Sequence, residues 1–162
     1  MNEKNCSIQT ILGVTPDGKW GPLSEAALRV AAYGEWTYCK ASSFADPVDV
    51  ARFLRCKGEG KTDMECFKVG DNGVGLWGDD CTVANPICAL PPEDWHPLGK
   101  RARGAKVLVR CGADTVICEL RDTMPKKQNI HNGAGIDLNL AACQALGLIV
   151  PTMAEVSWKY LL

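Results

Sequence analysis

Two acidic motifs in the last third of the chain decide the predicted fold: Glu119-Leu120-Arg121-Asp122-Thr123-Met124-Pro125, and Gly135-Ile136-Asp137-Leu138-Asn139-Leu140-Ala141-Ala142-Cys143-Gln144-Ala145-Leu146-Gly147. Stretches rich in β-branched residues at 107–109 and 116–120 predict strands, and the second strand brings Asp122 to a turn. Asp137 follows fifteen residues later, just before a short Ala- and Leu-rich helix. The pattern predicts two strands joined by a polar loop, each strand carrying one carboxylate.

These motifs resemble those of the rare lipoprotein A and expansin-like families, which share a double-psi β-barrel. There an Asp-Arg-Gly-Pro turn is followed by Ile-Asp-Leu-Ser and by an Ala-Ala-x-x-Leu-Gly helix. Here 122–125 stands in for the first motif, while 136–139 and 141–147 match the other two closely. The resemblance implies a protein that acts on cell-wall polysaccharides. It also implies a mainly β fold (α+β overall), a six-stranded double-psi β-barrel preceded by a helical N-terminal region.

A second resemblance lies near the start of the chain, at residues 8–28. It combines Gln9, a Leu12-Gly13 step, a Pro16-Asp17-Gly18 turn and an Ala- and Leu-rich helix that opens at Pro22. This pattern is similar to the last two helices of the small peptidoglycan-binding helical domain. We therefore expect a peptidoglycan-binding-like segment at 1–35, a helical connector at 36–68 and the barrel at 69–162.

Composition excludes several classes of function. The 162 residues carry a net charge of −1, which argues against a nucleic-acid binder. No apolar stretch approaches the roughly 18 residues of a membrane span, and no apolar signal region follows Met1. Basic spots at 100–103 and 126–127 indicate solvated loops or, alternatively, attraction to an anionic wall polymer.

Nine cysteines indicate an oxidising, extracytoplasmic location, in the cell wall or periplasm. Cys111 and Cys118 flank an expected hairpin turn, and Cys56 and Cys66 bracket a Gly-rich loop, so both are candidate disulfide pairs. The spacings do not match zinc motifs, and the two histidines offer few co-ligands. Cysteine richness without a visible leader favours a phage or prophage product, associated with a virion or a lysis system; a mature protein with a cleaved leader is the alternative.

The middle of the chain predicts two helices and the first barrel strand. Asp46 and Pro47 suit the start of a helix over 46–56, and Thr62 and Glu65 have the spacing of a capping box. We expect 69–80, which is rich in glycine, to form the first strand of the barrel. That strand would end in Asp79 and Asp80 at the rim of a cleft.

The candidate site has two catalytic aspartates. Cleavage of a glycosidic bond needs a carboxylic acid whose pKa is raised by an apolar setting, and Asp137 lies between two apolar residues. The chain also resembles the membrane-bound lytic transglycosylase A family, which implies Asp137 as the acid and Asp122 as its partner or a substrate contact. The expected substrate contacts are Trp77, Asp79, Asp80, Trp95 and His96.

Each assignment has a structural alternative. Asp122 and Asp137 can instead bind backbone amides where the psi loops cross, and Asp137 can cap the following helix. The expected function is cleavage of peptidoglycan by a lytic transglycosylase or muramidase-like enzyme. The alternative is a non-catalytic wall-binding or virion-associated module. No cofactor is expected, although Asp71, Asn72, Asp79 and Asp80 form an alternative calcium site.

Overall fold

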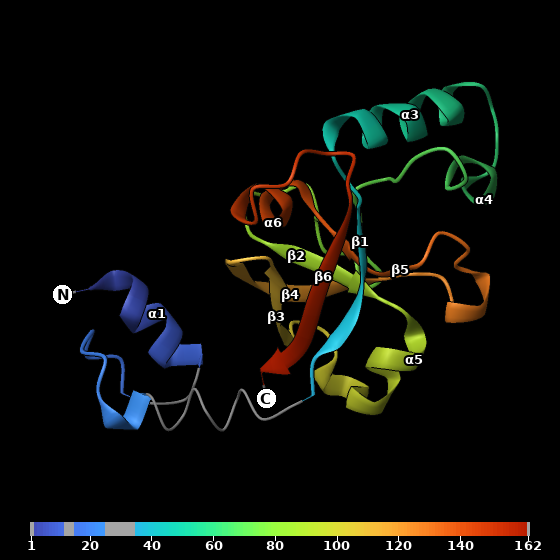
Figure 1. Cartoon of the computed structure of the whole chain (residues 1–162). Helices are drawn as coiled ribbons and strands as arrows, with labels where there is room; N and C mark the ends of the chain where they lie inside the picture. Colours follow the sequence, from blue (N-terminus) through green and yellow to red (C-terminus); the bar gives the residue numbers. More distant parts are fainter. Residues whose placement is uncertain (1, 12–14, 25–34, 162) are drawn as a thin grey trace.

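Six strands close into a barrel in the computed structural model, which describes residues 2–11, 15–24 and 35–161. Around the barrel the order is β1-β5-β2-β4-β3-β6 (Figure 1). The strands are β1 (Thr37–Ser43), β2 (Ile87–Leu90), β3 (Lys106–Cys111), β4 (Asp114–Thr123), β5 (Ala134–Leu138) and β6 (Met153–Leu161). The predicted six-stranded, mainly β architecture is confirmed, as is the final strand.

The strand pairing has an internal twofold symmetry. β1 pairs with β5 and β2 pairs with β4 in parallel, whereas the other four pairings are antiparallel. Exchanging β1, β2 and β3 for β4, β5 and β6 turns every pairing into another observed pairing of the same direction. The predicted double-psi topology is confirmed by this pattern, in which each half of the chain contributes one strand to each parallel pair.

Every second residue in the central parts of β3, β4 and β5 is buried, and these apolar side chains fill the barrel. The buried side chains include Val107, Val109, Val116, Cys118, Leu120, Ile136 and Leu138. Because successive side chains in a strand point to opposite faces, Asp137 faces away from the interior that Ile136 and Leu138 occupy. The same alternation that builds the core therefore directs this carboxylate to the outside of the barrel.

Short helices surround the barrel. They are α1 (Glu3–Ile11), α3 (Pro47–Gly58), α4 (Asp63–Cys66), α5 (Pro92–Trp95) and α6 (Leu140–Ala145), with 3₁₀ turns at His96–Arg101 and Lys127–Asn129. α3 and α4 lie at one end of the barrel (Figure 1). Both were predicted: Asp46 caps α3, and the Thr62–Glu65 capping box opens α4. The predicted Cys56–Cys66 disulfide is confirmed and joins the two helices.

The first barrel strand was wrongly placed at 69–80. That segment contains only an isolated bridge between Val74 and Asp80, and the strand next to β5 and β6 is β1, from the expected connector. Two glycines explain the difference. A Cβ on Gly70 would lie 2.4 Å from the Asp49 carbonyl oxygen, and one on Gly75 would lie 2.2 Å from the Arg121 carbonyl oxygen. These glycines allow the segment to pack tightly on α3 and β4 as a loop.

The proposed Cys111–Cys118 disulfide is also wrong. The hairpin between β3 and β4 forms as expected, but Cys111 lies opposite Asp114 and Cys118 lies opposite Val107. The two cysteines therefore occupy different positions along the ladder, and both are free thiols. The turn was predicted correctly, whereas the register that decides which side chains meet was not.

The N-terminal segment contains a compact turn. A buried Gln9 side chain donates to the Asp17 carboxylate, the Lys19 carbonyl and the Ser24 hydroxyl, each at 2.9 Å, and it accepts from the backbone N–H of Gly18. The Pro16–Gly18 turn is present, with a left-handed Gly18. The rest of the predicted helix, over 26–31, lies outside the described residues, and peptidoglycan binding by this segment stays a prediction.

One buried side chain, that of Asn139, joins three parts of the barrel. Its Oδ1 accepts from the backbone N–H groups of Ile87 and Ala142, at 2.9 and 3.0 Å. Its Nδ2 donates to the carbonyls of the loop before β2, at Cys81, Val83 and Asn85. Asn139 thus caps α6 and fixes the loop that leads into β2.

We predict that Asn139→Ala lowers the free energy of unfolding by at least about 3 kcal/mol, because several buried backbone groups lose their partner. Asn85→Ala is the matched control, since the Asn85 side chain is exposed in the same loop. Urea denaturation measures both. A loss of less than about 1 kcal/mol for Asn139→Ala would contradict this role.

Candidate functional site

The strand registers place four residues in one row across the barrel. Ser42 of β1 lies opposite Asp137 of β5, Asp137 lies opposite Ala89 of β2, and Ala89 lies opposite Asp122 of β4. The two aspartates are therefore two strands apart, a separation of roughly 10 Å between their Cα atoms. The small side chain of Ala89 lies between them, so nothing bulky separates the two carboxylates.

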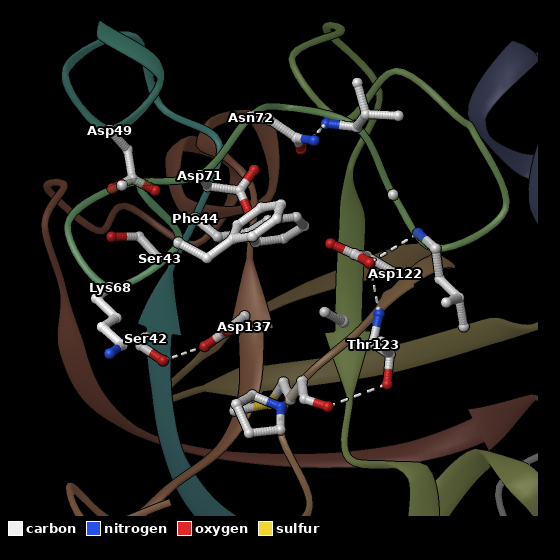
Figure 2. A pocket seen from close by; sticks show the side chains of 18 of the residues that line it. Ser42, Ser43, Phe44, Asp49, Lys68, Asp71, Asn72, Asp122, Thr123 and Asp137 are labelled. Atoms are coloured by element: carbon white, nitrogen blue, oxygen red, sulfur yellow. Dashed lines mark hydrogen bonds between the residues drawn. The ribbon is translucent and has the colours of Figure 1, made fainter. Parts of the chain in front are cut away.

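An open groove of about 970 Å³ lies over this row (Figure 2). Its lining includes all four residues of the row and the loop 67–76 that crosses from α4 toward β2. Two further carboxylates, Asp49 and Asp71, line the same groove. A smaller adjoining pocket of about 350 Å³ shares Ser42 and Asp137 and extends the site to His131. The two aspartates of the sequence motifs are thus brought to one groove.

Asp137 is a partly buried carboxyl that lines the floor of the groove. Burial raises the pKa of Asp137 to about 6, and the nearby carboxylates of Asp122, Asp71 and Asp49 also raise it. A hydrogen bond from the Ser42 hydroxyl to Oδ1 opposes this rise. The alternative that Asp137 caps α6 is excluded, because Asn139 holds that position. Asp137 therefore titrates near pH 6 at the surface of the groove, about two units above an ordinary aspartate.

Asp122 is held by backbone amides. Its Oδ1 accepts from the N–H groups of Leu76, at 2.8 Å, and Thr123, at 2.7 Å. Burial raises the pKa of Asp122 to about 6, while both amide hydrogen bonds oppose the rise. The bond to Leu76 also ties the loop 67–76 to β4. Asp122 thus binds backbone amides, as the structural alternative to a catalytic role predicts, and it also lines the groove.

Sequence reasoning missed Asp49 as a groove residue and considered Asp71 only for calcium. Asp49 accepts from the Ala45 N–H at 3.3 Å, and Asp71 accepts from the Gly73 N–H at 2.7 Å. Burial raises the pKa of both carboxyls, and Asp71 adds to the rise at Asp49. Asp49 lies in the first turn of a helix and Asp71 in a loop, so only the tertiary fold brings them together.

The expected rim aspartates lie elsewhere. Asp79 forms an ion pair with Arg103, at 2.8 Å, and with Arg121, at 3.2 Å, and the hydrogen bond from Arg103 is the main cause that lowers its pKa. Asp80 accepts from the hydroxyl and the N–H of Thr82, which lowers its pKa. Neither residue is among those that line the groove. A role of Asp79 and Asp80 in substrate binding stays a prediction, and no contact with the groove supports it.

The aromatic candidates form a cluster of their own. Trp77 packs edge-on against Trp95, with ring centroids 5.4 Å apart, and Trp95 packs against His96 at 4.3 Å. The indole N–H of Trp95 donates to the Thr123 hydroxyl at 3.0 Å. Trp77 and Trp95 pack on the barrel core, and none of these three side chains is part of the groove lining. Contact of these rings with a sugar stays a prediction.

No group of three or more His, Cys, Asp or Glu side chains is placed to hold a metal ion within residues 2–11, 15–24 and 35–161. The four residues weighed as a calcium site are divided: Asp71 and Asn72 line the groove, while Asp79 and Asp80 have the partners described above. In the same residues, no helix is long and apolar enough to cross a membrane.

Comparisons with known proteins give structural similarity only. No family model matches the chain, and no curated protein matches it. The Streptomyces papain inhibitor is similar over 80% of this chain and 96% of its own, with 20% identity and a TM-score of 0.49. Two structures of Clavibacter michiganensis expansin, a point mutant in complex with cellohexaose and the apo form, are similar over 79% of this chain and 51% of theirs. Their identity is 13%, with TM-scores of 0.48 and 0.49.

The raised pKa of Asp137 predicts a pH dependence of stability. The unfolded carboxyl titrates near 3.8 and the folded one near 6, so the folded state binds the proton more tightly. This contribution is fully present below about pH 4 and is lost as pH rises through about 6. Between these limits, wild type should lose on the order of 2–3 kcal/mol more stability than Asp137→Asn.

Urea denaturation at a series of pH values measures this difference. Asp114→Asn, at the exposed end of β4, is the control and should follow the wild-type curve. Parallel curves for wild type and Asp137→Asn would show that the folded pKa of Asp137 is not raised.

Proposed function

We propose that the groove binds a cell-wall polysaccharide, peptidoglycan or a related glycan, and that Asp137 protonates the oxygen of a glycosidic bond. The observation that carries this proposal is a partly buried carboxyl with a pKa of about 6 at the floor of an open groove. General acids of this kind combine an apolar setting with access to the leaving oxygen. The reaction would be that of a lytic transglycosylase or a muramidase-like hydrolase.

In the proposed reaction the two aspartates have different roles: Asp137 carries the proton and Asp122 carries the negative charge. Asp122 receives two amide N–H donors, which stabilise its carboxylate, whereas Asp137 receives one hydroxyl. Both carboxyls titrate near pH 6 and repel as anions, so they titrate as a pair, and in the proposed reaction Asp137 is the protonated member. Asp122 then carries the negative charge that stabilises a developing oxocarbenium ion.

The fate of the glycosyl cation decides between the two enzyme types. In a hydrolase, Asp122 acts as the base or nucleophile and the product has a reducing end. In a lytic transglycosylase, the 6-hydroxyl of the same sugar attacks and leaves a 1,6-anhydro end. Both reactions need the same proton from Asp137.

A non-catalytic binding module is the second candidate, and one observation favours it. Asp122 uses its Oδ1 to hold the loop 67–76 on β4, a structural task that needs no reaction. In this case the groove would bind the glycan strand without cleaving it. The proposed setting in either case is extracytoplasmic or virion-associated, which the Cys56–Cys66 disulfide supports.

Digestion of purified peptidoglycan sacculi, followed by mass spectrometry of the soluble products, tests the proposal. We expect muropeptides from the wild type and at least roughly a hundredfold less product from Asp137→Asn, because the variant has no proton to donate. Asp114→Asn should retain wild-type activity. Anhydro ends identify a transglycosylase and reducing ends a hydrolase. If the sacculi stay intact but bind the protein, the enzyme proposal is wrong and the non-catalytic binding module takes its place.

A further inference from the structure

The lining of the groove combines several carboxylates with exposed apolar side chains. Asp49, Asp71, Asp122 and Asp137 supply four carboxylates, and Lys68 is the only basic side chain among the described residues that line it. With all groups ionised, the groove has a formal charge of −3, although the whole chain has a charge of only −1. Figure 2 shows Asp71, Asp122 and Asp137 around one space, with Asp49 at its edge.

Two of these carboxylates have no task in the proposed reaction. Asp49 and Asp71 each accept one backbone N–H, and neither forms an ion pair with a Lys or Arg side chain of the described residues. Burial raises the pKa of each, and at Asp49 the charge of Asp71 adds to it while Arg52 opposes it. Half-buried like charges cost free energy that an opposite charge would offset.

The loop 67–76 also adds exposed apolar side chains to the lining of the groove. Phe67, Val69, Val74 and Leu76 line it, with 50%, 53%, 48% and 48% of their surface exposed. The loop that carries them is fixed at three points: the Cys56–Cys66 disulfide, the close contact of Gly70 with α3 and the bond from Leu76 to Asp122. Exposed apolar side chains held on a fixed loop beside a groove are typical of a binding surface.

From this combination we propose that the groove selects glycans whose amino sugars carry free, protonated amines, over N-acetylated or acidic glycans. The pyranose rings lie with their apolar faces against the side chains of Phe67, Val69, Val74 and Leu76. The ammonium groups point to the carboxylates of Asp49 and Asp71. This inference rests on the proposed function and names the class of polysaccharide that the groove prefers.

Charge complementarity is the reason for proposing a glycan with free amines as the ligand of the groove. An ammonium group in the groove gains attraction from several carboxylates in a partly desolvated space, where screening by salt is weaker than at an open surface. A glycan with free carboxylates meets repulsion from the same groups. A neutral N-acetylated glycan keeps the apolar contact and loses the charge contact, so it binds more weakly.

Calorimetric titration of the full chain with two matched ligands tests the inference: a β-1,4-linked glucosamine hexamer and its fully N-acetylated form. At about pH 6.5 and low salt, we expect the free-amine hexamer to bind at least roughly tenfold more tightly. The preference should fall severalfold in high salt. Asp49→Asn combined with Asp71→Asn should remove most of it, while Asp114→Asn, outside the groove, should leave it unchanged.

The other outcomes distinguish a failure of this inference from a failure of the proposed function. Equal or tighter binding of the N-acetylated hexamer would overturn the selectivity and leave polysaccharide binding in place. Absence of binding to both hexamers and to sacculi would overturn the proposed function itself. Hexalysine is the third ligand: if it binds as tightly as the free-amine hexamer, the groove recognises cationic chains in general and the glycan assignment is wrong.

Discussion

The site depends on the hydrogen bonds of one buried side chain, that of Asn139. It follows β5 directly, caps α6 and binds the loop that leads into β2, so it holds β2 and β5 in their antiparallel register. Asp137 is two residues away on the same strand. A side chain that satisfies five backbone groups at once tolerates little movement, because every shift would leave a buried polar group without a partner.

From this fixed register, the geometry of the groove follows. The parallel partners of β2 and β5 are β4 and β1, so the same rung carries Ser42, Asp137, Ala89 and Asp122. The alternation within β5 buries Ile136 and Leu138 in the barrel and turns Asp137 outward. The loop 67–76 then covers the row from outside and removes enough water to raise the pKa of the carboxyls. The groove is thus enclosed enough to raise these pKa values to about 6, and it is still open enough to admit a ligand.

Much of this arrangement could be predicted from the sequence, because it is encoded locally. The hairpin of β3 and β4, the final strand, the caps of α3 and α4 and the two acidic motifs all have short signals. β1 was missed because Lys40, Ser42 and Ser43 give it a polar composition, and its place depends on pairing with distant β5 and β6. Asp49 and Asp71 meet Asp137 only through the packing of α3 and the glycine-rich loop on the barrel, which no local pattern specifies. The supposed Cys111–Cys118 pair depended on a register that turn residues alone do not fix.

Titration of the Asp137 carboxyl carbon by NMR, in wild type and in Asp122→Asn, tests most directly whether Asp137 is the proton donor of the groove. We expect a midpoint near pH 6 in wild type. In Asp122→Asn we expect a lower midpoint for Asp137, because one neighbouring negative charge is removed. A midpoint near 4 in both proteins would mean that Asp137 is ionised throughout the neutral range, and it would contradict the assignment of Asp137 as the acid.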